Sequence, residues 1–91
     1  MNEVLTLLSE RGKRDVFAGV RSIGQSEFYE ASARDFAPEM KFVLRDYLDY
    51  DGEQYARYSG RVYKVIRTYL AGQEMELTVQ RASVEEAGLY E

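Results

Sequence analysis

Four acidic residues close together in the middle of the chain are the first candidates for chemistry: Asp46, Asp49, Asp51 and Glu53. Several carboxylate oxygens on one loop are the ligands that a hard cation such as Ca²⁺ prefers. Their spacing does not match an EF-hand loop, which closes with a glutamate. Asp51-Gly52 is also a common turn dipeptide. We therefore interpret this stretch as a solvated turn and predict no metal site.

Few residues remain with which an enzyme could work. The chain has no His and no Cys, which excludes a Ser-His-Asp triad, thiolate nucleophiles and the commonest metal ligands. Carboxylate pairs such as Glu27 with Glu30, or Asp49 with Asp51, could hydrolyse a glycosidic bond. A chain of 91 residues divided among six strands leaves little room for a substrate cleft. We expect no enzymatic activity and no cofactor.

The segment Gly24-Gln25-Ser26 precedes a predicted helix, and a helix N-terminus can bind an anion. It lacks the glycine spacing and the lysine of a phosphate-binding loop. Glu27 in the first turn would also repel a phosphate. We interpret the segment as a strand end followed by a helix that begins at Glu27, with Ser26 as its N-cap.

Tyrosines are concentrated in the second half of the chain, where six of the eight lie between Tyr47 and Tyr69 with basic residues among them. Tyr and Arg are enriched at protein interfaces, and we favour that interpretation. Plain strand packing is one alternative. Another is a stacking platform for single-stranded nucleic acid on a small barrel, although the net charge of −4 and the nearby acidic residues oppose phosphate binding. The candidate interface residues are Tyr55, Arg57, Tyr63, Arg67 and Tyr69.

Short strands have to position these residues, because turn dipeptides separate β-branched and aromatic runs along most of the chain. We predict strands over residues 4–8, 15–23, 40–45, 53–58, 61–70 and 74–82. Closure into an antiparallel barrel would remove exposed edges. The predicted fold is therefore mainly β: a small six-stranded antiparallel β-barrel with one short helix or loop insertion between strands 2 and 3.

Strand faces follow from the alternation of apolar residues. We expect Met75, Leu77 and Val79 to face inward, and Val62, Ile66 and Leu70 to share one face of the fifth strand, with Ile66 in the core. Residues 1–82 are predicted to form a single barrel domain, and residues 83–91 an acidic tail that is flexible or a short helix.

Nothing in the sequence predicts a membrane association. Its apolar runs are far shorter than a membrane span. The first residues lack the basic and then apolar pattern of a secretory signal. We expect the protein to be made and assembled in the cytoplasm.

An ordered series of segments resembles the head closure proteins of tailed phages, which are also called head completion, stopper or head–tail joining proteins. The segments are residues 21–31 (RSIGQSEFYEA), 42–47 (FVLRDY), 51–55 (DGEQY), 60–69 (GRVYKVIRTY) and 75–81. The order of these segments is specific, whereas no single one is a sharp motif. The turn at residues 9–13 is shorter than in many members of the family, and the acidic tail has no counterpart that we can place.

The resemblance implies a ring, dodecameric on the virion, that lies between the portal or head–tail adaptor protein and the tail of a phage or prophage. It implies that the ring closes the DNA channel after packaging without sequence-specific binding, and that it offers a docking surface to the tail terminator or other tail proteins. An acidic wall suits such a channel because it does not hold phosphates. The resemblance places these residues at the channel as a gating segment: Gly24, Gln25, Ser26, Glu27, Phe28 and Tyr29.

Overall fold

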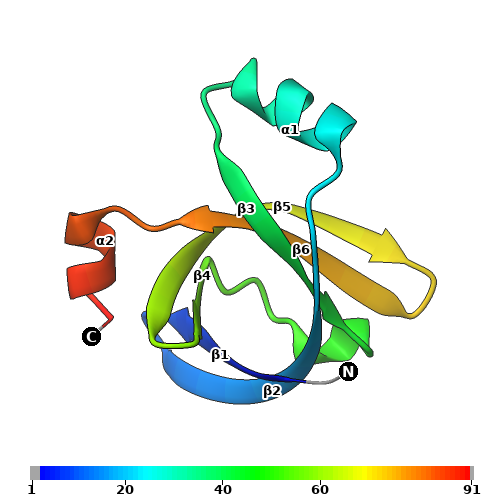
Figure 1. The fold of residues 1–91 in the computed structure, drawn as a ribbon. Helices are drawn as coiled ribbons and strands as arrows, with labels where there is room; N and C mark the ends of the chain where they lie inside the picture. The colour runs from blue at the N-terminus through cyan, green and yellow to red at the C-terminus, as the bar shows by residue number, and fades with distance from the viewer. Residues whose placement is uncertain (1–2, 91) are drawn as a thin grey trace.

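A closed barrel of six antiparallel strands forms the body of the molecule, as predicted from the sequence (Figure 1). The computed structural model describes residues 3–90. The strands are β1 (Glu3–Ser9), β2 (Gly12–Arg21), β3 (Pro38–Leu44), β4 (Tyr55–Tyr58), β5 (Arg61–Ala71) and β6 (Glu74–Arg81). Helix α1 (Gln25–Ser32) lies between β2 and β3, the 3₁₀ helix η1 (Tyr47–Asp49) follows β3, and helix α2 (Val84–Gly88) follows β6. Neither α1 nor α2 is long and apolar enough to cross a membrane.

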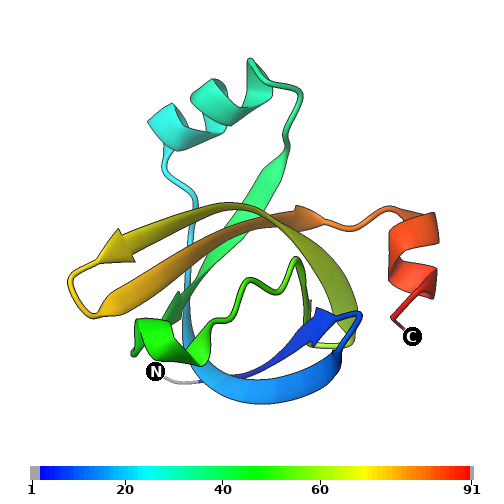
Figure 2. The same ribbon diagram turned by 180° about the vertical axis from the view of Figure 1, so that it is seen from behind.

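The strand order around the barrel is β1-β2-β3-β6-β5-β4. The barrel closes where β4 pairs with β1, through Thr6 with Arg57, Leu7 with Ala56 and Leu8 with Tyr55. The view from behind shows the long β5–β6 hairpin crossing in front of β3 and extending past the rest of the barrel (Figure 2). This closure pairs strands that are distant in the sequence and leaves the two helices outside the barrel.

Alternating side chains from all six strands fill the barrel. The buried core consists of Leu5, Leu7, Ala18, Phe42, Leu44, Ala56, Tyr63, Leu77 and Val79. Phe42 is the centre of an aromatic group, since its ring lies edge-on to those of Tyr58 and Tyr63 at centroid distances of 5.2 and 6.1 Å. The inward face predicted for the sixth strand is confirmed, since Leu77 and Val79 are fully buried and Met75 packs against the core.

The faces predicted for β5 are wrong, because Tyr63 and Val65 face the interior, whereas Val62, which was predicted to share a face with Ile66 and Leu70, is not part of the core. The pairing with β6 shifts register between Val65 and Arg67, so Ile66 is an extra residue that interrupts the alternation. Tyr63 and Val65 belong to the core or pack against it, whereas Ile66 does not and Leu70 is 52% exposed. A period-two pattern read from the sequence cannot include a bulge, because the bulge depends on the partner strand.

The β4–β5 turn forms at Ser59-Gly60, between the strands predicted over residues 53–58 and 61–70. Both residues have a positive φ, 52° for Ser59 and 77° for Gly60, as a type I′ hairpin turn requires. The local sequence therefore sets the register of this hairpin.

Candidate assembly surfaces

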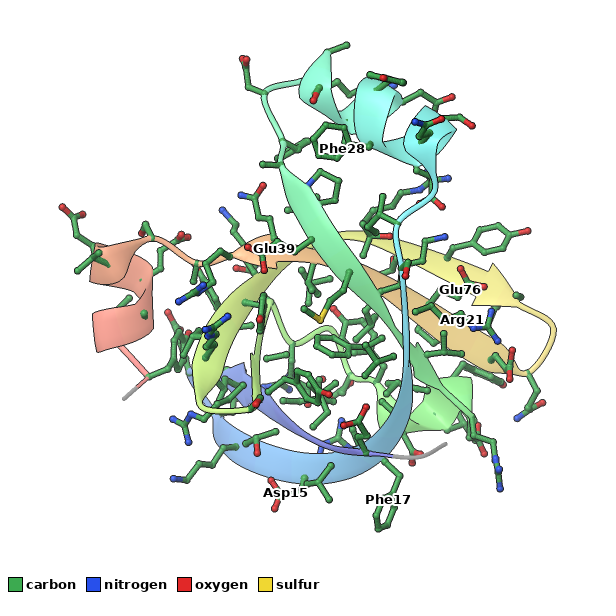
Figure 3. All side chains as sticks on the ribbon, in the orientation of Figure 1. Asp15, Phe17, Arg21, Phe28, Glu39 and Glu76 are labelled. Atoms are coloured by element: carbon green, nitrogen blue, oxygen red, sulfur yellow. The ribbon has the colours of Figure 1, made fainter. Side chains whose placement is uncertain are left out.

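Helix α1 stands away from the barrel on two extended arms (Figures 1 and 2). None of its residues, 25–32, is buried. Phe28 and Tyr29 are 43% and 67% exposed, and the ring of Phe28 lies on the side of α1 that faces the start of β3 (Figure 3). All six residues of the predicted gating segment are in or next to this helix, so the segment is an exposed, ordered projection.

The start of α1 differs from the prediction. Gly24 is the N-cap, and no side chain caps the helix, so Ser26 lies inside the first turn and is not the cap. A serine one position into a helix cannot accept the bond from the free amide groups that an N-cap serine accepts. Gly24 is extended, and the helix begins at Gln25.

Two contacts tie α1 and its second arm to the barrel. The Glu27 carboxylate forms an ion pair with the Lys41 ammonium on β3. The Gln80 side-chain oxygen on β6 accepts a hydrogen bond of 3.0 Å from the Ala37 amide. Among the described residues, α1 contributes no side chain to the core, so the packing of the core does not depend on the position of this helix.

A cavity of about 330 Å³ lies between α1 and the barrel. Its lining includes Glu27 and Glu30, the carboxylate pair considered for catalysis, together with Arg34 and Arg67. Glu27 is neutralised by Lys41. The cavity therefore combines two carboxylates with two guanidinium groups, and the Lys41 ammonium is paired with one of the carboxylates.

The five candidate interface residues do not form one surface. Tyr63 is 2% exposed and belongs to the core, so its side chain is not available to another subunit. Tyr55 and Arg57 lie on the outside of β4 and contact the C-terminal segment. Arg67 and Tyr69 are exposed on β5 beyond the bulge, and Tyr69 is 56% exposed. The strand order separates these pairs, because β4 pairs only with the first residues of β5.

Residues 83–90, here called the C-terminal segment, dock on the outside of β4 and β5. Glu86 accepts a hydrogen bond of 2.6 Å from the Tyr55 hydroxyl, and its carboxylate lies 3.5 Å from Lys64 Nζ. The rings of Tyr55 and Tyr90 stack at a centroid distance of 4.9 Å, and Arg57 donates to the Tyr90 carbonyl. The segment is therefore a short helix, one of the two predicted alternatives, and Ser83 and Glu86 close a capping box at its start.

The hydrogen bond between Tyr55 and Glu86 perturbs both groups. It lowers the pKa of Glu86 to about 2, with help from the Ser83 amide, and it raises the pKa of Tyr55 to about 12. Both shifts favour the pair of charged carboxylate and neutral phenol at neutral pH. Neither group therefore changes its charge across the physiological pH range.

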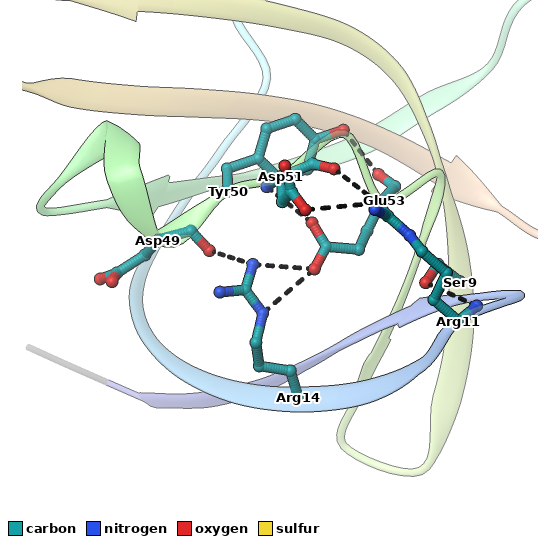
Figure 4. A network of polar contacts seen from close by, with 7 residues as sticks. All are labelled: Ser9, Arg11, Arg14, Asp49, Tyr50, Asp51 and Glu53. Carbon is teal, nitrogen blue, oxygen red and sulfur yellow. Dashed lines mark hydrogen bonds and ion pairs between the residues drawn. The ribbon is translucent and has the colours of Figure 1, made fainter.

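The acidic loop is organised around Glu53, which is 6% exposed (Figure 4). Arg14 of β2 reaches across and donates to Glu53 from Nε at 3.2 Å and from Nη2 at 2.8 Å, and Nη2 also donates to the Asp49 carbonyl at 2.7 Å. The Asp51 amide donates to the second oxygen of Glu53 at 2.8 Å. The loop is thus held on the β1–β2 hairpin by one buried carboxylate.

These contacts also decide the protonation of Glu53. Burial by itself raises the pKa of this carboxyl, but hydrogen bonds from the Asp51 amide and the Arg14 guanidinium outweigh burial and lower it below its ordinary value. Within residues 3–90, no group of three acidic side chains is arranged to hold a metal ion. The geometry agrees with a structural turn.

One exposed apolar pair lies outside the predicted candidates. Val4 and Phe17 are cross-strand partners on β1 and β2, and they are 55% and 66% exposed. Phe17 points away from the barrel, as does the nearby Asp15 (Figure 3). The alternation in β2 already places Phe17 opposite Val16 and Ala18, so the signal was in the sequence, although it did not show that the outer face stays uncovered.

No model of a known protein family matches the sequence, and no curated protein matches it. The function has to be inferred from the residues and the geometry of the fold.

Proposed function

We propose that this chain is a structural component of the head–tail connector of a tailed phage or prophage. In this proposal it assembles as a ring under the portal or adaptor protein, closes the DNA channel after packaging and offers a docking surface to tail proteins. It works without catalysis, cofactor or membrane, in the host cytoplasm during assembly and then in the virion.

The observation that carries the proposal is the position of α1. A rigid closed barrel holds an exposed helix on two arms between β2 and β3, which is where the resembling family has its channel segment. A projection that buries no core residue can adopt two positions while the barrel keeps its place in a ring. Such an arrangement suits a gate.

The surface of the barrel supports assembly. Val4 and Phe17 on one side, and Arg67 and Tyr69 on another, are two different exposed patches. Ring formation requires head-to-tail contacts between unlike patches of each subunit. In contrast, a platform for single strands would need exposed rings, and Tyr63 is buried while Tyr58 packs against Phe42.

One experiment tests ring formation and closure of the DNA channel separately. The wild-type chain is mixed with the portal–adaptor complex and imaged by electron microscopy, and a closed ring below the complex is the expected result. A variant whose residues 25–36 are replaced by a short Gly-Ser loop should still form the ring, because α1 contributes no buried residue. Particles that carry this variant should lose their DNA.

Leu48→Ser is the control for a change outside the gating segment. Leu48 is an exposed apolar residue on η1. Particles with this substitution should retain their DNA. Full heads that keep their genome when the protein is absent would contradict the closure role. A failure of the wild-type chain to form a ring on any portal–adaptor complex of its own phage would contradict the connector role.

A further inference from the structure

The surface below the C-terminal segment is apolar at its centre and basic at its rim. Leu8 and Val62 are 2% and 5% exposed, although neither belongs to the core inside the barrel. Leu8 is the cross-strand partner of Tyr55, and Val62 is that of Arg57. The acceptor surface is defined here as Leu8, Tyr55, Arg57, Val62 and Lys64.

The C-terminal segment contacts this surface at Tyr55, Arg57 and Lys64. Tyr90 stacks on Tyr55, and Val62 shares the lining of a cavity with Val84 and Ala87. The Val62 carbonyl also accepts a hydrogen bond of 3.0 Å from the Ala82 amide, which brings the segment onto the strand. Without the segment, the outer face of β1, β4 and β5 would expose an apolar patch with cations at its edge, the usual composition of a protein interface.

The segment itself can leave without disturbing the barrel. None of the residues of α2 is buried, and Val84 and Leu89 are 92% and 77% exposed. A helix of this length is not stable by itself in water, so its order depends on the acceptor surface. Ala82 and Ser83 alone connect the end of β6 to α2, and a change in their backbone angles would redirect the whole segment.

The chemistry of the acceptor surface specifies its occupant. It binds a carboxylate between a phenol and an ammonium, and an aromatic ring against Tyr55. An identical segment is carried by every other copy of the chain. The contacts are the same whether the segment comes from the same copy or from a neighbour, so an exchange loses none of them.

We propose that, in the ring, the C-terminal segment of one copy occupies the acceptor surface of the adjacent copy. This inference rests on the proposed function, because the ring provides the neighbour at high effective concentration. The exchange links each subunit to the next through Glu86 and Tyr90, and it explains why an acidic segment follows a complete barrel.

The sequence contains no cysteine, so the introduced thiols are the only ones in this chain. Arg61→Cys and Ala87→Cys place one thiol on the barrel side and one on the segment side of the same cavity. Neither side chain makes a hydrogen bond or ion pair that holds the segment. Equal amounts of the two single variants are assembled on the portal–adaptor complex, treated with a short bismaleimide and analysed on a denaturing gel.

A covalent dimer from the mixed ring is the expected result. Ala33→Cys replaces Arg61→Cys in the matched control, because Ala33 is exposed at the end of α1, away from the segment, and this mixture should give no dimer. The double variant, Arg61→Cys with Ala87→Cys in one chain, should give linked multimers of the ring.

Two other outcomes distinguish failure of the segment exchange from failure of the connector role. If the ring forms but the double variant shows only cross-links within single chains, each segment stays on its own barrel and the exchange is refuted, while the connector role stands. If micrographs show no ring for the wild-type chain, the connector role falls and the exchange falls with it.

Discussion

The ion pair between Arg14 and Glu53 allows the sharpest prediction about stability. Arg14→Ala removes the two charge-assisted bonds to Glu53 and the bond to the Asp49 carbonyl. Glu53 keeps only the Asp51 amide as a donor to its side chain. The substitution leaves a carboxylate that is 7% exposed without its counter-charge, next to the space that the arginine occupied.

The loss in the free energy of unfolding depends on how well water can solvate Glu53 in place of the arginine. Breaking a fully buried pair costs about 3–5 kcal/mol. The Arg14 side chain is 44% exposed, so water can reach part of the site and the cost is smaller. Losing hydrogen bonds to a charged group costs about 1.5–3 kcal/mol, and we expect a loss in the free energy of unfolding of about 2 kcal/mol.

The chain has a matched control for this substitution. Arg11→Ala breaks the ion pair with Asp51, in which both side chains are exposed, 73% and 74%. Exposed pairs contribute about 0–1 kcal/mol. Urea unfolding followed by circular dichroism measures both variants, and with a slope of about 1 kcal/mol/M the Arg14→Ala midpoint should fall by about 2 M, well beyond that of Arg11→Ala.

The effect also has a defined pH dependence. The pKa of Glu53 is lowered in the folded state, so the stabilisation is complete above its unfolded pKa and is lost as the pH falls through the folded value. The difference between wild type and Arg14→Ala should therefore shrink on acidification below about pH 4. Equal midpoints for the Arg14→Ala and Arg11→Ala variants at pH 7 would refute the role assigned to the buried carboxylate.

Further predictions concern the core, a turn and the C-terminal segment. Phe42→Ala should cost about 3–5 kcal/mol in urea unfolding, because Phe42 is fully buried, whereas Ile66→Ala should cost far less than the 2–5 kcal/mol of a core isoleucine. Similar costs would show that Ile66 lies in the core after all. Gly60→Ala should cost about 1–2 kcal/mol, since its φ of 77° is left-handed, and unchanged thermal unfolding would contradict that backbone geometry. Ser83→Ala removes the capping box, worth about 1 kcal/mol, and should speed hydrogen exchange in α2 alone; uniform protection would contradict independent opening of the segment.

Local sequence was enough for the strands, their turns and the class of fold. Ser59-Gly60 makes a turn wherever strands flank it, and alternation in residues 74–81 selects Leu77 and Val79 for the interior. The turn dipeptide and the apolar alternation both depend on residues that are close in the sequence. They could therefore be recognised without a structure. The position of the helix between β2 and β3 followed from the same kind of signal, and only its cap was misassigned.

Tertiary structure decided what each face touches. The bulge at Ile66 arises from pairing with β6, and Tyr63 is buried because its face of β5 is the one that points into the closed barrel. Arg14 meets Glu53 across 39 positions of the chain because barrel closure brings β1 beside β4, and Tyr55 meets Glu86 across 31 because α2 packs on β5, the neighbour of β4. Contacts of such separation depend on the path of the whole chain, so the sequence determined which residues form strands, and only the closed barrel determined which of them remain free to bind a partner.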